Sequence, residues 1–227
     1  GFVNNQLDVT SLNTFCSGAD GFVVIWYNQS DASNNLIQAT LSNQPKIYDS
    51  FTGVELENGK PAIIFNGSAY LNASNNTYGN IDDLLTTIAV VKTYTGATSM
   101  ITSKGFVGNG EHMIYFRSSK YRYAIESQVI ISTGANIGNQ QNLFSLFMST
   151  GTNGVNQFNN GTLYHQDTTT QNLTGSYSGA PYAVGFNVNR NNWYLTGSLQ
   201  ELLTFNSDLI SDRLTIEDNI NTNYTIY

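Results

Sequence analysis

The sequence predicts an all-β domain, in which two antiparallel sheets pack as a sandwich and one α-helix closes the chain. Asn-Gly pairs such as Asn58-Gly59 and Asn66-Gly67 supply the positive φ angles that tight turns require. Strands that follow one another without helices between them are typical of an antiparallel sandwich or barrel. The clearest β-rich runs are Gly21–Tyr27, Ala62–Phe65, Thr86–Lys92, Met113–Phe116, Tyr121–Ile125, Gln128–Ser132, Leu143–Met148, Tyr182–Phe186 and Leu199–Phe205.

The C-terminal segment Asp208–Ile220 is the only amphipathic helix that the sequence predicts. Its acidic first turn suits the positive end of a helix dipole. An apolar stripe on one side of a helix needs a surface to cover it, and the sandwich provides one. The residues expected on that stripe are Leu209, Ile210, Leu214, Ile216 and Ile220.

The length of 227 residues fits one domain, residues 1–227. Asn72–Asn80 and Gly151–Thr174 are polar and lack periodicity, so we expect surface loops there rather than linkers. The chain starts at Gly1 with residues that are typical of folded sequence. We therefore expect a processed or truncated part of a larger protein.

The composition excludes several classes of protein. Hydrophobic residues make up 40% of the chain and charged residues 11%, against about 25% in an average protein. The net charge of −7 argues against a nucleic-acid partner, because phosphates favour clustered Lys and Arg. No apolar run approaches the length of about 20 residues that a membrane helix needs, so we expect no membrane insertion. Cys16 is the one cysteine, which excludes an internal disulfide, and we expect it to be a small buried residue.

Four basic residues lie close together in sequence, interleaved with aromatic residues. They are Lys104, Arg117, Lys120 and Arg122. A β-hairpin with polar residues on one face explains this pattern, and a contact with an anionic glycan or a phosphate is the alternative.

Several blocks resemble the concanavalin A-like lectin and glucanase superfamily, in particular its laminin G-like branch. Gly59–Leu71 looks like an early strand and turn of that branch. Thr86–Lys92 with Ile101–Gly105 looks like its next strand and loop, and Gly197–Tyr227 looks like its closing strand and helix. The resemblance implies a jelly-roll sandwich, and calcium is common among such relatives.

The block Gly21–Pro45 is similar to a segment of α-L-arabinofuranosidase B-type domains and of tail, fibre and capsid-associated proteins of bacteriophages. The usual pattern there is Trp-Tyr-Asp-Gln-Ser-Gly-x-Gly-Asn. This chain has Asn28 in place of the Asp, Asp31 in place of the first Gly and Ser33 in place of the second.

No pair of acids with the spacing of a glycosidase site is recognisable, so we expect no enzyme. Glu55 and Glu57 lie in a turn-rich segment and are expected at a solvated edge. Glu201 alternates with Leu199 and Leu203 and should lie on an apolar face. A buried carboxylate there needs a hydrogen bond, a ligand or a cation.

The candidate ligand-binding residues are Asn191, Asn192, Trp193, Tyr194 and Glu201, since sugars need aromatic faces beside polar groups. Calcium requires several converging oxygens, and the weak candidates for a site are Asn28, Asp31 and Asp167. No other cofactor is expected.

We expect a non-catalytic structural or adhesion module of an extracellular or virion assembly, of the phage fibre or capsid-decorating type. Its partners would be glycans or other subunits of the assembly, homo-oligomers included. One alternative is a glycoside hydrolase-type enzyme that acts on polysaccharide. Another is an architectural subunit without a ligand, whose apolar patches meet neighbouring chains.

Overall fold

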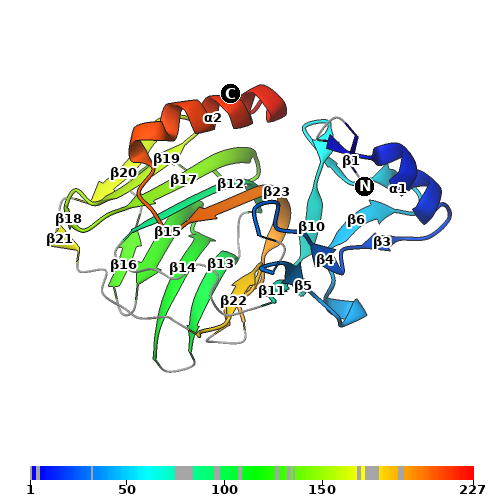
Figure 1. The fold of residues 1–227 in the computed structure, drawn as a ribbon, viewed down its shortest axis with the longest axis horizontal. Helices are drawn as coiled ribbons and strands as arrows, with labels where there is room; N and C mark the ends of the chain where they lie inside the picture. Colours follow the sequence, from blue (N-terminus) through cyan, green and yellow to red (C-terminus); the bar gives the residue numbers. More distant parts are fainter. Residues whose placement is uncertain are drawn as a thin grey trace.

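The computed structural model describes residues 2–227 apart from residues 4–5, 32, 75–83, 95–97, 107–108, 126–127, 132–133, 135, 168–169, 172–178 and 189–191. Two large antiparallel sheets face each other, and a helix lies over one of them (Figure 1). This is the predicted sandwich with a C-terminal helix.

The nine-stranded sheet lies next to the C-terminal helix. Along the sheet, its strands are β20 (Thr162–Asp167), β19 (Val155–Asn159), β17 (Gln141–Met148), β12 (Leu85–Thr93), β23 (Thr196–Phe205), β10 (Ile63–Asn66), β6 (Lys46–Asp49) and β3 (Gly21–Phe22), with β7 (Gly53–Val54) also beside β6. The central strand β12 is rich in Thr, Ile and Val, whose branched side chains suit a pleated sheet.

The eight-stranded sheet forms the second layer. Its strands, again in spatial order, are β16 (Gln128–Ile131), β15 (Lys120–Ile125), β14 (Asn109–Arg117), β13 (Ser99–Phe106), β22 (Tyr182–Val184), β11 (Leu71–Ala73), β5 (Leu36–Ile37) and β4 (Ile25–Trp26). Three small ribbons complete the described strands: β1 (Phe2–Val3) with β2 (Gln6–Leu7), β8 (Leu56–Glu57) with β9 (Lys60–Pro61), and β18 (Gly151–Thr152) with β21 (Thr170–Gln171).

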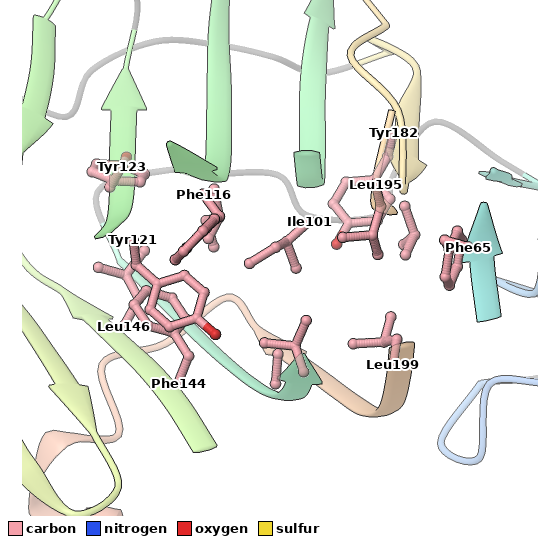
Figure 2. Close-up of a cluster of buried hydrophobic side chains, with 14 of the residues drawn as sticks. Phe65, Ile101, Phe116, Tyr121, Tyr123, Phe144, Leu146, Tyr182, Leu195 and Leu199 are labelled. Carbon is pink, nitrogen blue, oxygen red and sulfur yellow. The ribbon is translucent and has the colours of Figure 1, made fainter. Parts of the chain in front are cut away.

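The main core fills the space between the two sheets (Figure 2). Phe116 and Tyr121 of the eight-stranded sheet meet Phe144 of the nine-stranded sheet, and the rings of Tyr121 and Phe144 are 4.6 Å apart. Phe65, Ile101 and other apolar residues extend the cluster along the sandwich. Successive side chains of a strand point to opposite faces, so each of these strands also presents a second row of residues to the outside.

The helix α2 (Arg213–Tyr224) follows a short 3-10 turn, η2 (Ile210–Asp212), and covers the outer face of the nine-stranded sheet (Figure 1). Ile216, Ile220 and Tyr224 form its buried stripe and pack against Val90 and Phe147. These stripe residues are four apart and therefore share one side of the helix.

The prediction that Leu214 belongs to this stripe is wrong, because its side chain is 64% exposed. It lies two positions before Ile216, and residues two apart point to different sides of a helix. An ion pair holds the first turn instead: Arg213 contacts Glu217 at 2.5 Å, and its guanidinium lies 4.0 Å from the ring centroid of Phe158.

A second helix, α1 (Val9–Cys16), was not predicted. The carboxylate of Asp8 accepts a hydrogen bond from the backbone N–H of Ser11 at 3.0 Å and so caps its N-terminus. Val9, Leu12 and Cys16 form its inward-facing stripe, but the helix has only eight residues and Phe15 on its other side is 89% exposed, so the pattern is too short to stand out in the sequence. Cys16 is buried, as predicted.

The segment from Gly151 to Thr174 is not one surface loop, contrary to the prediction. Within it, β19 and β20 form a hairpin at the edge of the nine-stranded sheet. Asn160 and Gly161 connect them with φ angles of 50° and 72°, as an Asn-Gly turn between strands requires. No helix among the described residues is both long and apolar enough to cross a membrane.

Candidate functional site

The outer face of the eight-stranded sheet carries the candidate site. In β14, Ile114 and Phe116 point into the main core, whereas Met113 and Tyr115 point outward. In the adjacent strands, Met100 and Ala124 share this outer face with them. The result is an apolar patch on the side of the sheet that faces away from the main core and from α2.

Trp193 lies over this patch. Its indole stacks on the ring of Tyr115, with ring centroids 5.8 Å apart and planes 28° from parallel. The backbone N–H of Met100 donates to the carbonyl oxygen of Trp193 at 3.2 Å. Trp193 has a φ of 56°, which is unusual for a bulky residue and persists only where the surroundings impose it. The position of the indole is therefore built into the fold.

The segment that leads to Trp193 is tied down across strand β13. The hydroxyl of Ser103 donates to the carbonyl oxygen of Phe186 at 2.7 Å and accepts from the N–H of Val188 at 3.1 Å. The N–H of Asn187 donates to the carbonyl oxygen of Asn192 at 3.2 Å. These bonds hold both arms of the segment against the sheet.

A second group of rings includes Tyr194, the residue that follows Trp193. The ring of Phe186 is 4.8 Å from that of Tyr70 and 5.0 Å from that of Tyr194. The side-chain amide of Asn43 donates to the hydroxyl of Tyr70 at 3.5 Å. Tyr70 and Tyr194 are both half-buried, so each leaves part of a ring at the surface.

The hairpin of β14 and β15 adds positive charge beside Tyr115. Arg122 is the cross-strand partner of Tyr115, and Arg117 pairs with Lys120, so all three basic residues share the outer face. The Nε atom of Arg122 is buried and has no hydrogen-bond partner among the described residues. The predicted hairpin with a polar face is confirmed for these three residues.

Lys104 does not belong to this group, although the sequence places it nearby. It lies on the inner face opposite His112 and is fully buried, and its ammonium donates to the carbonyl oxygen of Ala180 at 2.9 Å. Burial lowers the pKa of Lys104 to about 8. Burial, and secondarily the charge of Lys104, lowers the pKa of His112 to about 3, so this histidine is neutral at ordinary pH.

Among the residues predicted to bind ligand, Trp193 stacks on Tyr115, Tyr194 packs near Phe186, and Asn192 is exposed. Asn191 lies outside the described residues. Glu201 lies elsewhere, on the outer face of the nine-stranded sheet and opposite Val90. Burial raises the pKa of Glu201, and a hydrogen bond with Tyr224 of α2 lowers it in part.

A β-bulge in β23 explains the surroundings of Glu201. The pairing register shifts between Val90 and Val91, so that Val90 lies opposite Glu201 and Val91 opposite Leu199. Leu199 consequently faces the main core while Glu201 and Leu203 face the helix. The alternation predicted from sequence, with Leu199 and Glu201 on one face, is wrong for this reason.

The three calcium candidates do not form one group. Asn28 and Asp31 lie in the loop after β4, whereas Asp167 ends β20 at the far edge of the other sheet (Figure 1). The Oδ1 of Asn28 accepts from the N–H of Ser30 at 2.9 Å, and the Oδ1 of Asp31 accepts from the N–H of Ser33 at 2.9 Å. In the described parts of the chain no three His, Cys, Asp or Glu side chains cluster. These oxygens serve loop geometry, and the donor set does not fit a calcium ion.

Tyr70 is a member of the site that the sequence did not indicate, whereas Arg122 belongs to the basic cluster for which a contact with an anionic glycan was the alternative prediction. The signal for Tyr115 and Arg122 is the Ser118–Ser119 turn, where φ angles of 53° and 61° set a two-residue hairpin and hence their register. Nothing local in the sequence relates Tyr70 to Tyr194.

No protein-family model matches the chain, and no curated protein matches it either. Solved structures do. The carbohydrate-binding module CBM40 of the Ruminococcus gnavus IT-sialidase, bound to α2,3-sialyllactose, has a TM-score of 0.57 at 15% identity, over 68% of this chain and 95% of that module. An arabinofuranosidase complexed with arabinofuranosyl-α-1,2-xylobiose has a TM-score of 0.66 at 13% identity, over 94% of this chain and 53% of that one.

The NanB sialidase from Streptococcus pneumoniae is similar as well, with a TM-score of 0.51 at 13% identity over 59% of this chain. This chain spans about a quarter of the sialidase, 23%, and about half of the arabinofuranosidase. Identities this low establish the fold alone. The fold is a concanavalin A-like sandwich.

Proposed function

We propose that this chain is a non-catalytic glycan-binding module that holds an acidic sugar on the outer face of its eight-stranded sheet. The observation that carries the proposal is the stack of Trp193 on Tyr115, with Arg122 directly opposite Tyr115 in the next strand. Trp193 and Arg122 are both partly exposed, and Tyr115 lies buried beside each of them.

The chemistry of an acidic sugar matches both parts. The C–H face of a sugar ring packs against an aromatic ring, and aromatic residues bury a large area in such contacts. A guanidinium can donate two parallel hydrogen bonds to one carboxylate. Arg117 and Lys120 add charge to the same face, while the chain as a whole carries −7. This face is therefore locally positive and attracts an anionic ligand, although the protein as a whole is negatively charged.

The similarity to CBM40 supports this proposal, since that module was solved with a sialylated lactose. As in the sequence prediction, we propose an adhesion role in an extracellular or virion assembly. The virion setting and the laminin G-like branch rest on sequence resemblance, and none of the structures named above is a virion protein.

A glycan array with sialylated, uronic and neutral glycans tests the proposal. We expect binding to acidic glycans that Trp193→Ala and Arg122→Met each reduce at least tenfold. Phe51→Ala is the matched control, because Phe51 is 96% exposed in the turn between β6 and β7. Absence of binding to any acidic glycan, or equal loss in the control, would contradict the proposal.

An arabinofuranosidase-like hydrolase is the second candidate, favoured by the match over 94% of this chain. Incubation with 4-nitrophenyl α-L-arabinofuranoside distinguishes the two functions. Release of 4-nitrophenol that depends on a carboxylate of this chain would establish the enzyme, and we expect none above the uncatalysed rate.

A further inference from the structure

A pocket of about 390 Å³ lies on the opposite side of the molecule from Trp193, beside the C-terminal end of α2. Its floor includes Lys92 and Gln141, which are cross-strand partners on the outer face of the nine-stranded sheet. Its size falls in the usual range of about 300–1,000 Å³ for small-molecule sites. Of its nine lining residues, five carry a side-chain amide: Asn58, Asn139, Gln140, Gln141 and Asn160.

The two charged residues that line the pocket neutralise each other. The ammonium of Lys92 lies 3.1 Å from the Oε2 of Glu57, and these side chains are only 22% and 19% exposed. The hydroxyl of Ser198 also donates to Glu57, at 3.4 Å. The prediction that Glu57 lies at a solvated edge is therefore wrong. The pocket offers hydrogen bonds without net charge, unlike the face around Arg122.

The walls of the pocket are fixed by the fold itself. The side-chain amide of Asn58 donates to the carbonyl oxygens of Tyr224 and Thr225, both at 2.9 Å, and so joins the β8–β9 turn to the end of α2. Four residues that line the pocket have left-handed φ angles, between 50° and 65°: Asn58, Asn139, Asn160 and Thr225. Such a conformation is unusual for Thr and marks a backbone imposed by its surroundings.

An aromatic ring stands at the same place. Tyr94 follows Lys92 by two residues, so it shares the outer side of the strand, and the ammonium of Lys92 lies 5.7 Å from its ring centroid. Tyr94 is 46% exposed. Its ring can receive the C–H face of a sugar while neighbouring amides, which both donate and accept, bind the hydroxyls.

We propose that this pocket is a second binding site, selective for a neutral sugar residue. The side-chain amides of Asn58, Gln140 and Gln141 donate within the fold, so that their oxygens face the pocket as acceptors for sugar hydroxyls. Asn160 accepts from the N–H of Leu143 through its Oδ1, so that its NH₂ group is the donor that it offers a hydroxyl. A carboxylated or phosphorylated ligand would have to displace Glu57 from Lys92, which would leave a partly buried carboxylate without its cation. The site shares no residue with the Trp193 face and does not depend on it.

Titration of the protein with sugars, followed by ¹H–¹⁵N NMR, tests this site. The side-chain amides of the lining residues give signals of their own, which shift when a sugar binds beside them. Lactose is the neutral probe and α2,3-sialyllactose its acidic counterpart, each at millimolar concentration. We expect lactose to shift amide signals that are assigned to Asn139, Gln140 and Gln141. The variants Tyr94→Ala and Gln140→Ala should each reduce the affinity at least tenfold, and Trp193→Ala should leave it unchanged.

The titration is then repeated with five other neutral sugars: glucose, galactose, mannose, xylose and arabinose. The outcome therefore does not depend on the choice of lactose as the probe. If none of the neutral probes shifts these amides, or if both pocket variants respond like the wild type, the proposal is overturned. Loss of the shifts in Trp193→Ala also overturns it, because the signal would then come from the other face. Failure of the acidic-glycan array leaves this test unaffected.

Discussion

The outer faces of the two sheets differ in what covers them. The nine-stranded sheet is closed by α2, whose Ile216, Ile220 and Tyr224 pack on apolar strand residues. On the outer face of the eight-stranded sheet, Trp193 packs on an apolar cluster, and three basic residues share that face. A helix with an apolar stripe contributes stability, whereas a partly exposed indole beside basic residues can present a ring and charges to a ligand. Aromatic residues should therefore act differently on the two faces.

The largest loss in the free energy of unfolding is expected from Phe147→Ala on the helix-covered face. Phe147 is almost fully buried beneath α2 and lies edge-to-face with Phe158 at 5.9 Å. Its truncation should lower the free energy of unfolding by about 3–5 kcal/mol, measured by urea denaturation. Glycan binding at Trp193 should be retained in the folded fraction. A smaller loss for Phe147→Ala than for Trp193→Ala would contradict this contrast.

His112, on the inner face of the eight-stranded sheet, should make the free energy of unfolding depend on pH. Its pKa is about 3 in the folded protein against about 6.5 in an unfolded chain. Between these values only the unfolded state holds the proton, so the free energy of unfolding rises with pH, by up to about 1.4 kcal/mol per pH unit. Urea denaturation from pH 4.5 to 6.5 should give a shallower slope in His112→Gln than in the wild type. Identical slopes would show that another group causes the dependence.

The backbone at Trp193 permits a comparison of two substitutions at one position. Both Trp193→Ala and Trp193→Gly remove the indole, but only glycine adopts a φ near 56° without a steric penalty. We expect the glycine variant to be more stable than the alanine variant by about 1 kcal/mol, in thermal or chemical unfolding. The usual order, with alanine the more stable, would show that the loop relaxes once the ring is gone.

The smallest loss in the free energy of unfolding is expected at the neutral pocket. Lys92→Met breaks the partly exposed ion pair with Glu57, and such pairs contribute about 0–1 kcal/mol. The loss in the free energy of unfolding should shrink further in high salt, which screens the pair. A loss above about 3 kcal/mol would mean that Glu57 is buried too deeply to lose its partner.

Much of the fold could be predicted because its central strands carry strong local patterns. Thr86–Lys92 and Tyr121–Ile125 are rich in β-branched or aromatic residues, and both lie within strands of the structure. The strand β13 was missed as a continuous element because it contains Ser103 and Lys104, polar residues that are buried through hydrogen bonds to distant carbonyls. Sequence alone gives no sign of those partners.

The candidate site was predictable only in part. Trp193 and Tyr194 stand out as aromatic residues in a polar stretch, and the structure stacks Trp193 on Tyr115 and packs Tyr194 near Phe186 and Tyr70. Their partners Tyr115 and Tyr70 are 78 and 124 residues away from them in sequence, as 193 − 115 and 194 − 70. Such pairings depend on strand order and register, which no local pattern encodes.

The strand β23 occupies the middle of the nine-stranded sheet, between β12 and β10, although it comes near the end of the chain (Figure 1). During synthesis from the N-terminus, β10 and β12 leave the ribosome with a vacant place between them. The sheet cannot close until Thr196–Phe205 has also emerged. Closing pairs so distant in sequence is slow, and exposed strand edges favour association with other chains meanwhile. A chaperone that shields the edges of β10 and β12 would therefore act chiefly before Thr196–Phe205 has emerged.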